Sequence, residues 1–382
     1  MNYQSIVLSG GGAKGPYGLG VLLALQKYHS EHKKEITKIY CGTSVGALNA
    51  TLAAQGELAH LTKLYSQIRT KDILGVTESS LKKLRMLWVG NRRPFSYFEN
   101  TALKSTIEKF ANFDKLCDAH LLICATNYKT GDLETFYISS VIDEFLEHEQ
   151  SHPADTRRMV NYHRIESQEQ LVTALLASTA IPFYLPPVEI NKRLYVDGGV
   201  GNNTPLKQAA YISRFLSCRG GAVLQPTICV INDPSRFTID PGEFSDAFGV
   251  IRRTMDIYHN ELVGDSYLSW DRINNEVRLG EERENRLISH IQGLQGVPVD
   301  KLAELANLVR ESLRATSTST PRCHLPLMVV RPATPLLDDI LLFDPAVAKR
   351  LRRHGVADCL TLLASKDQIS VHNQRRWTEE IE

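Results

Sequence analysis

Cys41-Gly42-Thr43-Ser44-Val45-Gly46 places a serine between two glycines, where an apolar run ends and an Ala- and Leu-rich run begins. A strand that turns sharply into a helix at such a serine forms a nucleophile elbow, because the glycines let the helix pack closely on the strand. Free N–H groups at the start of the helix favour a developing negative charge. We therefore predict that Ser44 is a catalytic nucleophile; the alternative is a serine that only caps the helix.

Short apolar or β-branched runs alternate with longer helical patterns on both sides of this turn. The expected strands are Tyr3–Ser9, Ile36–Cys41, Leu121–Thr126, Thr135–Ser139, Arg193–Val196, Thr227–Asn232 and Leu327–Arg331. The helices expected after the first two strands are Pro16–Glu31 and Val45–Gln55. This alternation predicts an α/β fold with a mostly parallel central sheet that helices cover on both faces.

A second strand-to-helix turn, Gly10-Gly11-Gly12-Ala13-Lys14-Gly15, follows the first expected strand. Its glycine spacing matches a dinucleotide fingerprint, but the second strand ends without the acidic residue that would hold a ribose. A P-loop is also disfavoured, because Lys14 is followed by glycine and not by a hydroxyl residue. The turn suits an oxyanion hole beside Ser44, built from Gly10, Gly11 and Gly12, with the last two as the preferred donors.

A carboxylate is the expected general base. None of the twelve histidines stands in an evident strand-end turn, whereas Asp197 leads from the apolar run Arg193–Val196 into Gly198 and Gly199. An aspartate of ordinary pKa is a poor base for a hydroxyl, so the site must exclude water and raise that pKa. The alternative is that Asp197 only opens a glycine turn.

Composition limits the classes of function. The 382 residues carry 44 Lys and Arg against 43 Asp and Glu, which indicates neither disorder nor a general attraction for nucleic acid. No apolar stretch approaches the ~20 residues of a membrane-spanning helix, and the first residues do not resemble a secretory signal, so we expect a cytoplasmic protein. The seven cysteines are scattered, which predicts reduced, buried thiols and no metal site.

Three motifs together resemble the patatin-like phospholipase family: Gly10–Gly15, Gly42–Gly46 and Asp197-Gly198-Gly199, in that order. Other stretches that resemble the family are Cys124–Asn127, Ala177–Pro182 with Pro186, Val200 followed by Asn202–Pro205, and Leu342–Pro345 leading into a helix that ends at Gly355. The resemblance extends over residues 3 to 360 and implies a three-layer α/β/α sandwich.

The resemblance also implies a serine lipid acyl hydrolase, of phospholipase A or lysophospholipase type, without a cofactor. Ser44 would attack an ester of a membrane phospholipid or lysophospholipid after Asp197 takes its proton, and Gly10 to Gly12 would hold the oxyanion. Lys14 stands where the family usually has Arg or Lys. It either favours a phosphate headgroup or only fixes the loop.

We expect one domain over residues 1–360, with polar insertions near 143–170 and 281–321, and a C-terminal tail at 361–382. A cytosolic enzyme of this class would threaten its own membranes if never restrained. The two insertions are where we expect control by a ligand or partner.

Residues 81–95 carry five cations, no acid and two aromatic side chains. That mixture suits peripheral contact with the inner face of a membrane through Trp88, Arg92, Arg93 and Phe95. The alternative is that the apolar residues of this segment face the core while its lysines are solvated.

Two other functions fit parts of the sequence. An α/β-hydrolase with a Ser-His-Asp triad would share the elbow at Ser44, but it needs a histidine after the acid; the candidates are His259, His290, His324, His354 and His372. A nucleotide-binding module would use Gly10–Gly15 and would be stabilised by NAD or ATP.

Overall fold

The computed structural model describes residues 1–33, 35–74, 96–151, 162–218, 222–235, 247–294, 298–315, 323–337, 339–366 and 368–381. Its centre is a ten-stranded sheet whose main path runs β10-β9-β1-β2-β3-β4-β5. The strands are β1 (Asn2–Leu8), β2 (Thr37–Thr43), β3 (His120–Asn127), β4 (Leu133–Ile138), β5 (Tyr162–Arg164), β6 (Val188–Ile190), β7 (Arg193–Asp197), β8 (Val223–Leu224), β9 (Thr227–Val230) and β10 (Leu327–Val330). The seven strands expected from the sequence are all present, with small shifts at their ends.

Pairing in the sheet is mostly parallel. The neighbours from β10 through β9, β1 and β2 to β3 all run in one direction, and β5 is parallel to β4. Antiparallel pairing is confined to the region of β3, where β4 and β7 both run against β3 and β6 runs against β7. The carboxyl ends of β1 and β2 therefore meet at one edge, where the turns after parallel strands place functional residues.

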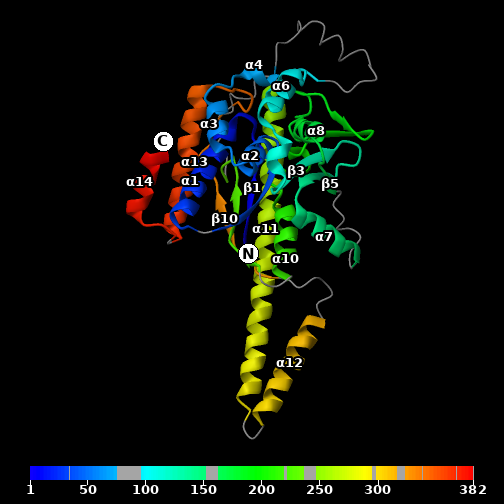
Figure 1. Ribbon diagram of the computed structural model, residues 1–382, viewed down its shortest axis with the longest axis vertical. Helices are drawn as coiled ribbons and strands as arrows, with labels where there is room; N and C mark the ends of the chain where they lie inside the picture. The colour runs from blue at the N-terminus through cyan, green and yellow to red at the C-terminus, as the bar shows by residue number, and fades with distance from the viewer. Residues whose placement is uncertain are drawn as a thin grey trace.

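Helices cover both faces of the sheet and give three layers (Figure 1). One face carries α1 (Gly15–Glu31), α2 (Val45–Ala54), α3 (Leu58–Tyr65), α6 (Thr101–Phe110), α8 (Gln168–Ser178) and α13 (Pro345–Ser365). The other carries α7 (Ser140–Ser151), α10 (Leu206–Cys218) and part of α11 (Ala247–Gln292). Alternate residues of one strand supply the two cores: Ile6 and Leu8 face the first, and Val7 faces the second. The expected α/β/α sandwich is confirmed.

Gly355 lies inside α13, so the expectation that this helix ends there is wrong. A Cβ at Gly355 would lie 2.0 Å from the carbonyl oxygen of Tyr17, and one at Gly20 would lie 2.0 Å from the carbonyl oxygen of Arg352. The two glycines let α1 and α13 approach until their backbones touch. In the sequence, a glycine needed for close packing is indistinguishable from one that caps a helix.

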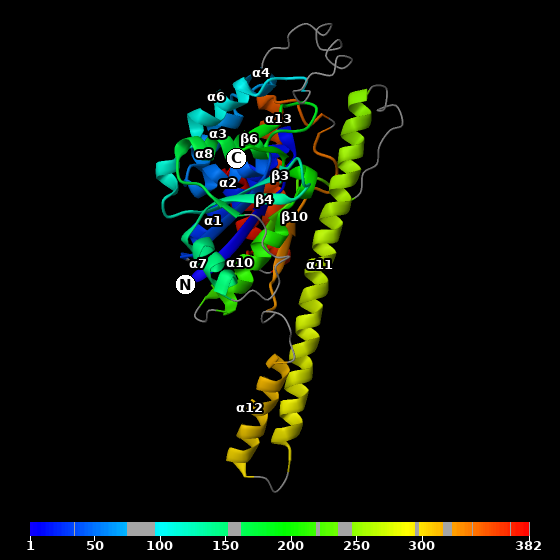
Figure 2. The same ribbon diagram turned by 90° about the vertical axis from the view of Figure 1, so that its right-hand side faces the viewer.

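A helical hairpin extends beyond the layered body (Figure 2). It consists of the far half of α11 and of α12 (Val299–Ala315), which lies beside it. At 1.5 Å per residue, the 46 residues of α11 extend about 69 Å. Trp270 of α11 fixes the near half to the body by donating its Nε1–H to the carbonyl of Leu325 at 2.8 Å. The described part of the expected insertion at 281–321 belongs to this hairpin.

The remaining elements complete the body. They are α4 (Thr70–Leu74), α9 (Gly199–Asn202), α14 (Val371–Ile381) and two short 3-10 helices, Gly12–Lys14 and Phe113–Leu116. In the expected insertion at 143–170, β5 pairs with β4 at the edge of the sheet. In the expected tail at 361–382, Trp377 of α14 is 1% exposed and joins the core beside α1 and α13. Among the described helices, none has the length and hydrophobicity needed to span a membrane.

Candidate active site

The pairing of β2 and β7 with the same edge of β3 brings Ser44 and Asp197 close together. One edge of β3 is occupied by β4 along residues 121 to 126. The other edge is shared: β2 pairs in parallel up to Thr43 opposite Cys124, and β7 pairs in the opposite direction up to Asp197 opposite Ala125. Two strand ends thus approach each other along a single edge. The residue after Thr43 is Ser44, so the hydroxyl and the carboxylate meet where β2 and β7 end.

Ser44 has the strained backbone of a nucleophile elbow, with φ 55° and ψ −129°. A side chain at positive φ is costly, and such strain is concentrated at functional positions. Ser178 holds the turn: its hydroxyl accepts the Ser44 N–H at 3.0 Å and donates to the carbonyl of Cys124 at 2.6 Å. Gly46 allows α2 to start against β1, since a Cβ there would lie 2.2 Å from the carbonyl oxygen of Leu8.

Asp197 is 5% exposed, and the burial of its carboxylate raises its pKa from 3.8 to about 6. The hydroxyl of Ser44 and the backbone N–H of Gly199 oppose this effect and lower the pKa. The N–H of Gly199 donates to Oδ1 at 2.7 Å and orients the carboxylate. Oδ2 is buried and accepts no hydrogen bond of standard geometry from the described chain. The hydroxyl of Ser44 is thus close enough to lower the pKa of Asp197, although it makes no hydrogen bond of standard geometry to Oδ2.

The glycine turn presents two amides that donate no hydrogen bond to the residues the structure describes. The N–H of Gly10 donates to the carbonyl of Asn203 at 3.1 Å, and that of Ala13 donates to the carbonyl of Ile340 at 2.7 Å. Between them, Gly11 at φ 153° and Gly12 at φ 55° have N–H groups without an acceptor in the described part of the chain. Of the three glycines predicted from the sequence, these two are the ones with an amide available for an oxyanion.

Lys14 is held in the interior of the protein. Its ammonium group lies 2.5 Å from Oδ1 of Asp233, and the two side chains are 5% and 11% exposed. Arg331 donates from Nε and Nη2 to the backbone carbonyl of Asp233, at 3.1 and 2.9 Å. Asn232, the preceding residue, donates its Nδ2–H to the carbonyls of Ser9 and Gly10, at 3.0 and 2.9 Å. Of the two expected roles for Lys14, these contacts favour fixing the loop.

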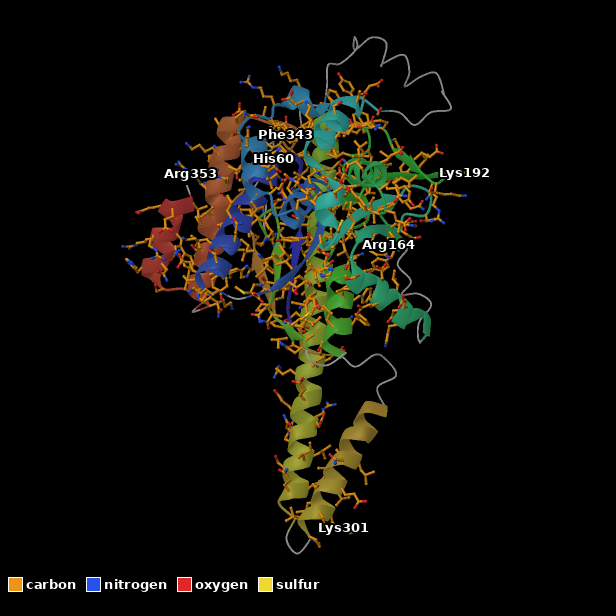
Figure 3. All side chains as sticks on the ribbon, in the orientation of Figure 1. His60, Arg164, Lys192, Lys301, Phe343 and Arg353 are labelled. Atoms are coloured by element: carbon orange, nitrogen blue, oxygen red, sulfur yellow. The ribbon has the colours of Figure 1, made fainter. Side chains whose placement is uncertain are left out.

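An apolar pocket with a cavity volume of about 50 Å³ leads away from Ser44. Its walls come from α2, α3, α4, α6 and the segment before α13; they include Leu48, Leu61, Leu103, Phe110, Leu341 and Phe343. Phe343 is labelled in Figure 3 near α3. The hydroxyl of Tyr65 is turned to the wall, because it donates to Oδ1 of Asn49 at 2.7 Å. The lining suits a hydrocarbon chain, and it has few polar groups that could bind a nucleotide.

Other residues predicted from the sequence either support the turns of this site or lie outside the described residues. Ala13, Gly15, Gly42 and Gly198 take part in the close packing of the two turns and of β7. No described histidine side chain forms a hydrogen bond with Ser44 or Asp197 or lines the apolar pocket. Trp88, Arg92, Arg93 and Phe95, predicted to contact a membrane, lie outside the described residues, and so does the rest of 75–95.

Comparison with known proteins places this site in a family. A family model described as patatin-like phospholipase matches residues 6–210, which include both strand-to-helix turns and β7. The chain belongs to the patatin-like phospholipase family. The matched region carries Ser44, Asp197 and the glycine turn, whereas Asp233 and the pocket wall at Leu341 and Phe343 lie beyond it.

Two curated proteins are similar to this patatin-like chain. A cGAMP-activated phospholipase from Pseudomonas aeruginosa is 26% identical over 206 residues, which are 53% of this chain and 54% of that protein. The uncharacterised protein L620 of Acanthamoeba polyphaga mimivirus is 24% identical over 248 residues, covering 55% and 64% of the two chains. The chain thus aligns with less than two thirds of the length of each relative. The solved structure of VipD from Legionella pneumophila matches with 15% identity over 95% of this chain and 67% of its own, at a TM-score of 0.35.

Proposed function

We propose that this protein is a serine lipid acyl hydrolase in which Ser44 and Asp197 form a catalytic dyad. The observation that carries the proposal is the meeting of the two strand ends on one edge of β3, with a strained serine opposite a buried aspartate of raised pKa. A base whose pKa lies near the working pH is well matched to proton transfer. The dyad opens onto an apolar pocket, which favours a fatty-acyl ester as the substrate.

In the first half of the proposed reaction, Oγ of Ser44 attacks the ester carbonyl carbon while Oδ2 of Asp197 takes the hydroxyl proton. The carbonyl oxygen becomes an oxyanion, which the N–H groups of Gly11 and Gly12 stabilise together with the amino end of α2. The tetrahedral intermediate then collapses, the bond to the alcohol oxygen breaks, and Asp197 returns the proton to that oxygen. The products are an acyl-enzyme on Ser44 and a free alcohol, such as a lysolipid.

In the second half, Asp197 takes a proton from water, and the water oxygen attacks the acyl carbon. The same two amides stabilise the second oxyanion. The bond to Oγ of Ser44 breaks, the serine recovers its proton from Asp197, and a fatty acid leaves. One carboxylate serves as base and then as acid in both halves.

The substrate class follows from the pocket. Its apolar walls begin at Ser44 and Gly12, so the part of an acyl chain next to a carbonyl at the dyad would meet apolar side chains. Chains of this kind occur in phospholipids and lysophospholipids, and an enzyme that acts on them works at the membrane surface as a peripheral protein. We place the activity in the phospholipase A or lysophospholipase class.

Hydrolysis of mixed phospholipid liposomes, with products identified by mass spectrometry, tests this function. Wild type is expected to release fatty acid, and Ser44→Ala and Asp197→Asn are expected to release none above background. A matched control is Ser66→Ala, which removes an exposed serine hydroxyl that donates to the carbonyl of Lys63 at 2.7 Å. Fatty-acid release by Ser44→Ala at the wild-type rate would contradict the proposal.

A further inference from the structure

A second pocket, separate from the apolar one, lies between two hairpin turns. One turn joins β3 to β4 and contributes Tyr128, Lys129 and Thr130; the other joins β6 to β7 and contributes Lys192 and Arg193. The pocket has a cavity volume of about 450 Å³, which is within the range of small-molecule sites. Figure 3 shows Lys192 at the outer edge of the body, away from the helical hairpin that carries Lys301.

The floor of this pocket is a buried, fully engaged carboxylate. The side chain of Glu134 is 1% exposed and accepts hydrogen bonds from Tyr195 at 2.6 Å, His163 at 2.7 Å and Asn127 at 2.8 Å. Burial by itself raises the pKa of Glu134, but these hydrogen bonds outweigh it and lower the pKa. Arg193 approaches the same carboxylate at 3.7 Å. The negative charge of Glu134 is therefore stabilised by these protein donors.

The rim is positively charged. Lys129, Lys192 and Arg193 are all exposed, and Glu134 is the one acid among the described residues that line the pocket. The three cations against the one charge of Glu134 leave a net charge of +2 among the residues that line the pocket, and Lys129 and Lys192 carry the part that is not shared with Glu134. Guanidinium and ammonium groups in this arrangement are suited to phosphate, which accepts several charge-assisted hydrogen bonds at once.

We propose that this pocket binds a phosphate group, either of an anionic lipid headgroup or of a soluble phosphorylated ligand. The site is distinct from the dyad: Arg193 precedes Asp197 by four residues on β7, or about 13 Å at ~3.3 Å per residue. It is nevertheless built on the same strand, and Tyr195, which lies between them, is anchored to Glu134 in the floor. A ligand held at Arg193 would thus rest on the strand that positions the proposed base.

Binding measurements in a Ser44→Ala background test the proposal independently of hydrolysis. One arm titrates inorganic phosphate by calorimetry, and the other measures flotation with vesicles of phosphatidylcholine and phosphatidylglycerol against phosphatidylcholine alone. The pocket variant is Lys129→Ala with Lys192→Ala, and the charge-matched control is Lys301→Ala with Lys366→Ala. All four lysines are exposed, so the fold is expected to be retained.

The pocket variant is expected to lose at least about tenfold in affinity relative to the control, since each charge-assisted hydrogen bond contributes that much or more. Loss in the phosphate arm identifies a soluble phosphorylated ligand, and loss confined to the vesicle arm identifies a lipid headgroup. Equal binding by the pocket and control variants in both arms would overturn the proposal. Failure of the Ser44→Ala protein itself to bind either probe would overturn it too.

Discussion

Replacing Asp197 with Asn should increase stability while abolishing the proposed activity. The fold raises the pKa of this carboxyl from 3.8 to about 6, because the ionised form is buried at the end of β7. At about 1.4 kcal/mol per pKa unit, keeping Asp197 ionised in the folded protein costs about 3 kcal/mol. An asparagine resembles the protonated acid and avoids this cost.

The sign of the pH dependence follows from the raised pKa. The wild-type carboxyl is stabilising in its protonated form below pH 3.8, and that contribution is lost as the pH rises through about 6. The free energy of unfolding of Asp197→Asn minus that of wild type should therefore grow by about 2 to 3 kcal/mol between pH 4 and pH 8. The change with pH is the decisive quantity, because a constant cost of the amide cancels from it.

Urea unfolding of both proteins across that pH range provides the measurement, and liposome hydrolysis provides the functional readout. Wild-type activity should rise through a pH near 6 and level off above it, since only the ionised Asp197 can accept the serine proton. A stability difference that is the same at pH 4 and pH 8 would show that the fold does not raise the pKa of Asp197. An Asp197→Asn variant that hydrolyses lipid at the wild-type rate would show that Asp197 is not the base.

Three further changes test other parts of the site. Gly12→Ala should lower activity 10²- to 10³-fold, or about 3 to 4 kcal/mol, because the new Cβ would lie 2.3 Å from the carbonyl oxygen of Ile340 and displace an oxyanion donor. Its control is Gly131→Ala, which has a similar positive φ and nothing within 4 Å of the new Cβ, and which should retain activity in the same assay. Asp233→Asn should remove the carboxylate that the buried ammonium of Lys14 contacts and cost about 3 to 5 kcal/mol of stability in urea unfolding, and an unchanged unfolding curve would contradict the loop-fixing role. Trp88→Ala with Phe95→Ala should reduce liposome binding but spare hydrolysis of a small soluble ester; equal losses in both assays would count against an interfacial role.

The local features of the site could be predicted from the sequence because each depends only on a short run of neighbouring residues. A serine flanked by glycines between an apolar run and a helical run specifies the elbow at Ser44, and a strand that ends in Asp-Gly-Gly specifies Asp197. Their meeting could not be derived from the residues alone. It depends on the antiparallel pairing of β7 with the end of β3, a contact between segments about 70 residues apart in the chain.

The supporting contacts were missed for the same reason. Asp233 follows β9, and nothing in its own stretch of sequence marks it as the partner of Lys14; only the pairing of β9 with β1 brings the two together. Ser178 lies in a stretch recognised as family-like, but its bridge from the Ser44 amide to the carbonyl of Cys124 requires α8 to be packed on β3. The apolar pocket combines residues from Gly12 to Phe343 and has no sequence signature.

The pairing of Ser44 with Asp197 is tested most directly by the rate of covalent labelling with a fluorophosphonate, followed by peptide mapping of the adduct. We expect a single adduct on Ser44, formed faster as the pH rises through about 6, and formed at least about a hundredfold more slowly in Asp197→Asn. Labelling that persists in Ser44→Ala, or that proceeds at the same rate with and without the Asp197 carboxylate, would contradict it.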